Sequence, residues 1–392
     1  MKVIIVGGGI AGLAAAHQLE KYGMAPTILE KSGHLGGRIH TNTKNGFLLD
    51  VGFQVLLNKY PELTSEWKKA LALKSFLPGA LVRTAKGWKT ISHPLYDPLC
   101  VLHWPKGTFK GLYTLAFALP QPISMNESCD DYLKRLNLDE EWVNVFLKPF
   151  LKGVFLDCTL SVRAHRVIEL LRYFLWGRAC LPEQGMQAVP FWLANQLKRT
   201  QFLFNQSVIE VSEKEVRLQG GERFKADHVL ITVPLPDLCL LMDIELDRPS
   251  CGTICDYFSI SSKEKRANRY LWLDGRDGAL VNNFCFLNAI QPTYAPKGYH
   301  LISASQVGKG YSEEEILDYL ASSLEMKTSS FTHLKRYSLE HALPLQHTQP
   351  PFEDHYVNGC WVAGEAVSYP SINDAVASGR SAVNSMLRDL NL

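Results

Sequence analysis

The first thirty residues of the chain change from strand-like to helix-like spacing of apolar positions. Val3–Val6 is an unbroken β-branched run, which predicts a strand buried on both faces, as in a parallel sheet. Residues 11–22 are rich in Ala and Leu and predict a helix, with Gly23 where a C-terminal cap is expected. Thr27–Leu29 predicts a second short strand. We therefore expect a β-α-β unit at this end of the chain.

Two later regions have different patterns. Residues 56–181 look mainly helical, with amphipathic stretches at 130–150 and 161–176. Residues 246–345 alternate as strands do, and a helix predicted at 312–324 starts with the capping-box pattern Ser-x-x-Glu. The strand-like runs of this second region are 254–260 and 299–305. A sheet backed by helices is expected there.

Composition narrows the function classes. The chain has 392 residues, of which 46% are hydrophobic and 20% charged, and this length suits two globular domains. The formal net charge is only +2 and basic residues are scattered among acids, which argues against nucleic-acid binding. Nine cysteines without a C-x-x-C pair are typical of reduced thiols, so we expect a cytoplasmic protein. Cys251 and Cys255 lack a second ligand pair, and no metal site is expected.

A glycine turn follows the first predicted strand. Gly7, Gly9 and Gly12 form a G-x-G-x-x-G pattern between strand and helix. In such a turn the first glycine makes the tight bend, the second lets backbone approach a pyrophosphate, and the third lets helix and strand pack closely. Glu30 lies eighteen residues past Gly12, where an acceptor for the adenosine ribose hydroxyls is expected. The pattern predicts a dinucleotide site, and it serves both NAD and FAD.

Further motifs favour FAD. Gly36-Gly37-Arg38 lets backbone run against a ligand and supplies a cation for a pyrophosphate, and Asp50-x-Gly52 follows. Together with the glycine turn and the acid, these motifs resemble those of the FAD-dependent amine oxidase superfamily. That superfamily includes protoporphyrinogen oxidases, phytoene-type desaturases and monoamine oxidases.

The resemblance extends along most of the chain and implies FAD as cofactor. Residues 150–155 and 181–190 are similar to two further segments of desaturases and protoporphyrinogen oxidases, and a core strand of the cofactor domain is expected at 226–231. The residues that the resemblance places against FAD come from seven segments: Gly7, Gly9, Ile10, Ala11, Gly12, Glu30, Lys31, Gly36, Gly37, Arg38, Gly52, Phe53, Gln54, Val208, Gly364, Glu365, Ile372, Asn373 and Ala375.

The C-terminal segment would form the far wall of that site. In the family, an acid at the position of Glu365 holds the ribityl chain, and the next helix points its N-terminus at the flavin. The family usually has glycine where this chain has Asp374. Because a carboxylate facing the reduced flavin would oppose its negative charge, we expect the Asp374 side chain to point away from the ring.

The implied fold class is α/β. It combines a Rossmann-like FAD-binding domain with a discontinuous α+β substrate domain, in which a mixed or antiparallel sheet packs with helices. We assign residues 1–55, 182–245 and 346–392 to the FAD-binding domain, and 56–181 and 246–345 to the substrate-binding domain.

The expected activity is that of an FAD-dependent oxidoreductase. As a dehydrogenase, desaturase or oxidase, it would take hydride from a largely apolar, lipophilic small-molecule substrate to flavin N5. The electron acceptor is open between oxygen and a quinone, and peripheral contact with a membrane is also left open. The alternatives are a flavin amine oxidase that produces hydrogen peroxide and a non-catalytic flavin-binding protein.

Two departures from the family disfavour the amine oxidase. Asp256 stands at or near the position where many amine oxidases carry a lysine, and the paired tyrosine cage is missing after Gly364-Glu365. No catalytic residue is assigned, although Tyr337 and His341 are polar candidates. The aromatic residues of the two insertions are each more typical of core than of a cavity wall: Tyr173, Phe174, Trp176, Tyr257, Phe258, Tyr270, Trp272 and Tyr294.

Overall fold

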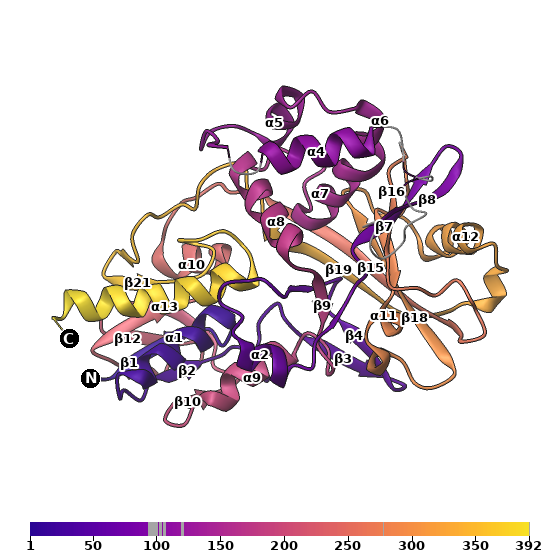
Figure 1. Cartoon of the computed structure of the whole chain (residues 1–392). Coiled ribbons are helices and arrows are strands. Elements are labelled where there is room, and N and C mark those ends of the chain that lie inside the picture. Colours follow the sequence, from indigo (N-terminus) through magenta and orange to yellow (C-terminus); the bar gives the residue numbers. More distant parts are fainter. Residues whose placement is uncertain (93–100, 102–103, 105–106, 119–120, 277, 392) are drawn as a thin grey trace.

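The computed structural model describes residues 1–392 except 93–100, 102–103, 105–106, 119–120, 277 and 392 (Figure 1). Two sheets and a group of helices make up most of the molecule. Among the described residues, no helix combines the length and the hydropathy needed to cross a bilayer.

A six-stranded sheet contains the N-terminal β-α-β unit. Its order is β10-β2-β1-β14-β21-β20, and only β20 and β21 pair antiparallel. The strands are β1 (Val3–Val6), β2 (Thr27–Leu29), β10 (Gln201–Leu203), β14 (His228–Ile231), β20 (Tyr356–Val357) and β21 (Cys360–Val362). The three predicted strands of this sheet are confirmed. Its strands come from three separate stretches of the chain, and the division into two domains stays a prediction.

Both faces of this sheet are covered, which explains the all-apolar first strand. Val3 and Ile5 pack with the helices of one face, whereas Ile4 and Val6 pack on the other face. The first layer consists of α1 (Ile10–Lys21), α9 (Ala188–Gln196) and α13 (Ile372–Asp389). The second consists of α10 (Leu235–Met242) and the small sheet of β11 (Val208–Val211), β12 (Glu215–Leu218) and β13 (Arg223–Lys225). Helices α1 and α13 lie side by side (Figure 1).

A seven-stranded sheet forms the other half. Its order is β19-β15-β18-β17-β16-β7-β8, with only β16 and β7 parallel. Its strands are β7 (Gly79–Thr84), β8 (Gly87–Ser92), β15 (Ser250–Ser261), β16 (Leu271–Asp274), β17 (Asn283–Phe286), β18 (Tyr299–Val307) and β19 (Thr332–Pro344). Helix α12 (Glu313–Leu324) packs on it and has the predicted capping box between Ser312 and Glu315. The strands and the helix predicted at 254–260, 299–305 and 312–324 are confirmed.

The expectation of a mainly helical region at 56–181 is wrong for residues 79–92. These form the β7–β8 hairpin, whose strand β7 alternates buried and half-buried residues, as a strand covered on one side does. The hairpin is held by pairing to β16, which lies almost 200 positions further along the chain. The sequence pattern around residues 79–92 therefore could not predict this pairing.

The helical part of the same region is broken into short pieces. It contains α4 (Thr108–Ala118), α5 (Cys129–Arg135), α6 (Glu140–Trp142), a π-helical turn (Val143–Leu147), α7 (Lys148–Phe155) and α8 (Ala164–Trp176). The single amphipathic helix expected at 130–150 is therefore wrong. Asn137 adopts φ 48° after α5, and Asp139 caps the next helix, so the chain turns between them. The expected helix at 161–176 is confirmed as α8.

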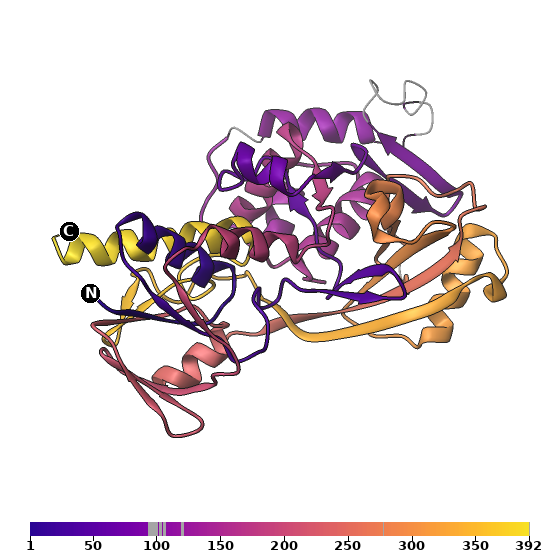
Figure 2. The ribbon, with the colours of Figure 1, turned by 90° about the horizontal axis from the view of Figure 1, so that it is seen from below.

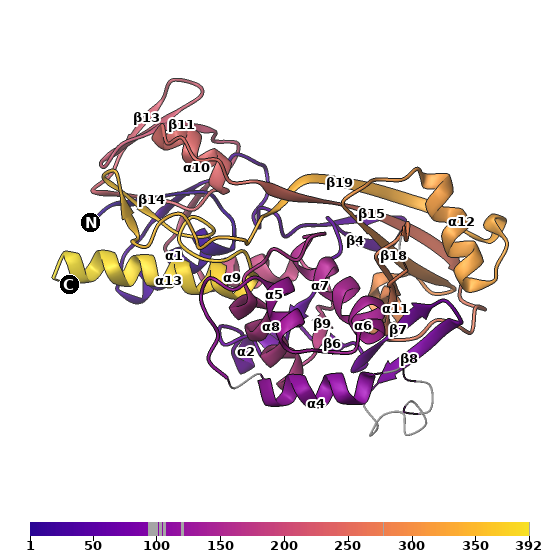
Figure 3. The ribbon, with the colours of Figure 1, turned by 90° about the horizontal axis from the view of Figure 1, so that it is seen from above.

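Shorter elements connect these parts: β3 (Thr41–Lys44), β4 (Phe47–Asp50), β5 (Leu56–Leu57), α2 (Ser65–Ala70), β6 (Lys74–Ser75), β9 (Ala179–Leu181) and α11 (Leu287–Ile290). The long strands β15 and β19 run from the six-stranded sheet to α12 at the opposite end of the molecule (Figures 2 and 3). Helices α4 to α8 lie together along one side (Figure 3).

Candidate functional site

The N-terminus of α1 faces a large cavity and carries no cap. Gly9 is the N-cap residue, no side chain bonds to the first turn, and that turn contains no acid. A Cβ on Gly9 would meet no atom within 4 Å, whereas one on Gly12 would lie 2.1 Å from the carbonyl oxygen of Gly7. The N–H of Gly36 donates to the carbonyl of Gly8 at 2.9 Å, which brings the second glycine turn beside the first. The positive end of the helix is thus open to an anion.

Glu30 directly follows β2 and is buried beside this turn. Its Oε2 accepts a hydrogen bond from the N–H of Gly8 at 2.7 Å, and its Oε1 accepts from the N–H and the hydroxyl of Ser32, both at 2.8 Å. The neighbouring Lys31 pairs with Asp237 at 2.7 Å. Glu30 and Lys31 both line the cavity. A carboxylate fixed here is available to ribose hydroxyls, as the motif predicts.

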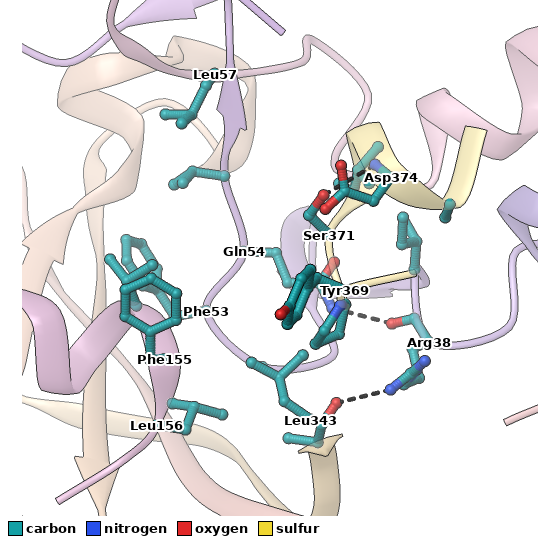
Figure 4. A pocket seen from close by; sticks show the side chains of 18 of the residues that line it. Arg38, Phe53, Gln54, Leu57, Phe155, Leu156, Leu343, Tyr369, Ser371 and Asp374 are labelled. Carbon is teal, nitrogen blue, oxygen red and sulfur yellow. Dashed lines mark hydrogen bonds between the residues drawn. The ribbon is translucent and has the colours of Figure 1, made fainter. Parts of the chain in front are cut away.

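Arg38 and Glu365 connect the N-terminal segment to the end of the last strand. Arg38 Nη2 lies 2.5 Å from Glu365 Oε2, and Nη1 donates to the carbonyl of Ala342 at 3.0 Å (Figure 4). The second oxygen of Glu365 accepts from the N–H of Leu235 at 2.7 Å. The buried carboxylate is therefore fixed by two partners, and Arg38 brings its charge to the cavity wall.

Asp50 is buried behind the wall rather than in it. Its carboxylate accepts hydrogen bonds from Thr41 Oγ1 at 2.5 Å, from the N–H of Met186 at 2.9 Å and from the Tyr294 hydroxyl at 2.9 Å. Burial raises the pKa of Asp50 to about 6, although these three hydrogen bonds act in the opposite direction. Asp50 therefore ties three distant segments together and positions the following residues, of which Gly52 lines the cavity.

The N-terminus of α13 forms part of the opposite wall. Ser371 caps it by accepting a hydrogen bond from the N–H of Asp374 at 2.9 Å (Figure 4). Asp374 lines the cavity, where its Oδ2 lies 2.8 Å from Nη2 of Arg166 in α8; that it points away from the flavin ring stays a prediction. The side chain of Asn373 is buried and accepts from the N–H of Glu62 at 3.1 Å. This helix end is therefore occupied by its own side chains, unlike that of α1.

The cavity has a volume of about 1840 Å³ and extends from the first glycine turn to helices α4, α7 and α8. Most of its wall is apolar, and Phe53 and Phe155 face Tyr369 and Leu343 across it (Figure 4). All predicted FAD contacts line it except Gly12 and Asn373. Gly12 packs against the turn, and the side chain of Asn373 accepts a hydrogen bond from the N–H of Glu62. For these two residues, as for the others, contact with FAD stays a prediction.

The polar candidates at 246–345 are distributed differently from expectation. Asp256 does not line the cavity, so it does not stand beside the cofactor as the motif alignment suggested. It is buried on the other side of β15, where Arg336 donates to both its oxygens at 2.8 Å. His341 lines the cavity, whereas the Tyr337 hydroxyl accepts from Asn42 at 2.8 Å outside it. Nearness along the chain to the last segment therefore does not decide which of these residues reach the cavity.

Some residues of the wall were missed. Tyr60, Arg166 and Glu169 all line the cavity, and they form its main polar cluster near α13. The spacing of Arg166 and Glu169 on an amphipathic helix was the available signal, but it equally suits a solvated face. Of the eight aromatic residues named above in the insertions, Tyr173, Phe174 and Trp176 line the cavity and the other five do not, whereas Phe146 and Phe150, which were not named, do line it.

The geometry suits FAD. Ligand pockets usually enclose roughly 300–1,000 Å³, so a cavity of about 1840 Å³ has room for a dinucleotide and a substrate together. The uncapped α1 terminus would hold the pyrophosphate, and the backbone of Ser207, Val208 and Ile209 lines the wall where the adenine is expected. Among the described residues, no cluster of His, Cys, Asp or Glu is arranged to hold a metal ion.

Residues 10–252, more than half of the chain, match the family described as "Flavin containing amine oxidoreductase". The chain belongs to this family. Flavin is therefore the cofactor of its family, and the family is one of oxidoreductases.

Individual relatives match over different lengths. The chain is 49% identical over 59 residues to "Possible lysine-specific histone demethylase 1" of Drosophila melanogaster, and 36% identical over 64 residues to protoporphyrinogen oxidase 2 of Arabidopsis thaliana. These matches span 15% and 16% of this chain but only 7% and 13% of the relatives' own lengths. With coproporphyrinogen III oxidase of Bacillus subtilis (strain 168), the alignment is 22% identical and covers 98% of this chain and 97% of that protein.

Solved structures share the fold. A putative protoporphyrinogen oxidase from Exiguobacterium sp. 255-15 superposes with a TM-score of 0.73 at 17% identity, over 99% of each chain. Putrescine oxidase bound to putrescine gives a TM-score of 0.70 at 18% identity, again over 99% of each chain. Because the identities are low, these structures establish the fold and not the substrate.

Proposed function

We propose that this member of the family is an FAD-dependent oxidoreductase that dehydrogenates a largely apolar small molecule. The observation that carries the proposal is the cavity, in which a dinucleotide cradle at α1 continues into an apolar chamber under α4, α7 and α8. A polar substrate would lose its hydration against a mostly apolar wall that offers it few partners, whereas an apolar one gains by burial. Isoprenoid or tetrapyrrole precursors fit this chemistry.

Bound FAD supplies the two-electron acceptor for the substrate, and the chain supplies orientation and a dry environment. Phe53 and Phe155 form one wall of the chamber, and Leu343 and Tyr369 face them (Figure 4). These apolar side chains exclude water and limit the substrate to a few orientations. No acid or base is required from the protein by this arrangement, and we assign none.

The test begins with the purified protein, which should be yellow and show flavin absorbance. Porphyrinogens and polyene precursors are then offered under air and under anaerobic conditions with a soluble quinone, which also identifies the electron acceptor. Ala116→Trp fills the chamber from α4, and Lys110→Trp adds the same group to the same helix away from the cavity. Loss of turnover in the first variant alone supports the proposal, and absence of flavin refutes it.

A flavin amine oxidase is the second candidate, because the family is described as one of flavin-containing amine oxidoreductases. The loop after Glu365 disfavours it. The aromatic face of Tyr369 is covered by the guanidinium of Arg166, 4.3 Å from the ring centroid, so a substrate ammonium would compete with a resident cation. A screen of amines for hydrogen peroxide distinguishes the two. Flavin that no donor reduces would instead indicate a non-catalytic flavin-binding protein.

We also propose that α4 rests on a lipid surface of an otherwise cytoplasmic protein. Phe109, Tyr113 and Phe117 are 74%, 59% and 62% exposed on α4, and Trp176 at the end of α8 is 74% exposed. Helix α4 contains no acid and one lysine, which suits anionic headgroups. Leu112 of the same helix lines the cavity, so a lipophilic substrate could enter from the bilayer side.

Flotation with vesicles that contain phosphatidylglycerol tests this surface. The wild-type protein should float with the vesicles, and Phe109→Ser combined with Phe117→Ser should remain in solution. Equal recovery of both proteins would refute the lipid surface. Self-association of the wild type that the same substitutions abolish would assign the patch to a second copy of the chain instead.

A further inference from the structure

One ion pair in the cavity joins the substrate side to the cofactor side. Arg166 of α8 and Asp374 of α13 lie 2.8 Å apart, and their side chains are only 12% and 16% exposed. Arg166 also pairs with Glu169 one turn along its own helix, and its guanidinium stacks on Tyr369. All four residues line the cavity. A pair shielded in this way from solvent acts on its surroundings more strongly than a surface pair.

Asp374 lies at the helix end that the resemblance to the family places against the flavin. It lies in the first turn of the eighteen-residue helix α13, and Ile372 and Ala375 of that turn line the same cavity. The helix end carries about half a positive charge, which favours negative charge nearby. A bare carboxylate at this end would reverse the sign of that effect. Arg166 supplies positive charge against Asp374, and it shares that charge with Glu169.

The pair is not needed to hold α13 in place. Arg380, further along the same helix, pairs with Glu62 outside the cavity. The helix also packs directly on α1, where a Cβ on Gly379 would come within 2.2 Å of the carbonyl oxygen of Ala11. These two contacts fix the helix without the Arg166–Asp374 pair, so the pair can act on the electrostatics of the cavity without being required for the position of α13.

We propose that the Arg166–Asp374 pair sets the reduction potential of the bound flavin. Arg166 is a positioning residue that acts through Asp374 by cancelling its charge at the end of α13. The inference rests on the proposed function only in so far as FAD binds. It explains how a chain with an aspartate in the first turn of α13 keeps a helix end that favours reduced flavin. It also makes the potential depend on α8, which belongs to the substrate side.

The experiment measures the midpoint potential of the flavin in the holoprotein by equilibration with reference dyes. Asp374→Asn removes a negative charge and should raise the potential, whereas Arg166→Gln leaves Asp374 uncompensated and should lower it. Each shift should correspond to at least a tenfold change in the ratio of affinities for the two oxidation states, which is about 30 mV for a two-electron couple. The double variant should return toward the wild-type value, and Arg166→Lys, which keeps the charge, should retain most of it.

Glu62→Gln is the matched control, because it breaks an ion pair of the same helix outside the cavity. Its potential should equal that of the wild type. FAD stoichiometry and melting temperature are recorded for every variant, so a variant that fails to load is separated from one that loads with an altered potential. Opposite shifts of the two single variants support the proposal. Unchanged potentials in loaded variants overturn it and leave the proposed function intact, whereas a wild-type protein without FAD overturns both.

Discussion

Asp50 should make the stability of the protein fall as the pH rises from about 4 to 7. Its folded pKa is raised from 3.8 to about 6 because the carboxyl is completely buried. Between these two values the folded state binds the proton and the unfolded state does not, so each pH unit of increase favours unfolding. A shift of about 2 units at about 1.4 kcal/mol per unit gives a loss of about 3 kcal/mol, complete near pH 7.

Asp50→Asn tests this reasoning because asparagine cannot ionise. The substitution disturbs the hydrogen bonds from Thr41, Met186 and Tyr294 at every pH. The informative quantity is therefore how the difference in unfolding free energy between the variant and the wild type changes with pH. The free energy of unfolding of the variant, relative to that of the wild type, should be about 2.4 kcal/mol higher at pH 7 than at pH 4 in urea unfolding. An offset that is the same at both pH values would refute the assignment.

Asp157 provides a control of opposite sign. Burial raises the pKa of this carboxyl, but hydrogen bonds from Thr159, Ser161 and Val162 outweigh it, and the pKa is lowered overall. Its contribution is therefore present above the unfolded pKa and is lost as the pH falls through the folded one. Asp157→Asn should destabilise the protein more at pH 7 than at low pH.

Three further predictions concern the cofactor turn and a helix cap. Gly12→Ala should destabilise the protein by about 1–3 kcal/mol and abolish flavin absorbance, because its Cβ would lie 2.1 Å from a backbone carbonyl oxygen. The control Gly220→Ala places its Cβ where no atom lies within 4 Å, so both the stability and the flavin absorbance should stay as in the wild type. Glu30→Gln should weaken FAD binding in equilibrium titrations, since an amide cannot accept at both oxygens of the buried acid, and unchanged affinity would contradict its role. Ser312→Ala should lower the unfolding free energy by about 1 kcal/mol, and Ser322→Ala, on the exposed face of the same helix, should leave it unchanged within about 0.5 kcal/mol.

Elements with a strong local signal could be predicted from the sequence. The strand Val3–Val6, the glycine turn and the start of α1 follow from β-branched residues, glycine conformational freedom and helix periodicity, all of which act over a few residues. The same holds for the capping box at Ser312. The dinucleotide cradle at α1 could be predicted because each of its motifs consists of residues that lie close together in the chain.

Other features depend on partners that are distant in sequence. The β7–β8 hairpin is held by pairing to β16. The helix expected at 130–150 ends where Asn137 adopts a left-handed backbone conformation. Asp256 faces away from the cavity because the alternation of β15 is fixed by its neighbours in the sheet.

The sequence by itself determined the family, the β-α-β cradle and the acid and arginine that accompany it, because each depends on residues close together in the chain. Only the tertiary structure decided the shape of the apolar chamber and the pairing of Arg166 with Asp374, which are 208 positions apart. Long-range contacts of this kind are selected by packing and electrostatics after the local elements have formed, so no local pattern encodes them.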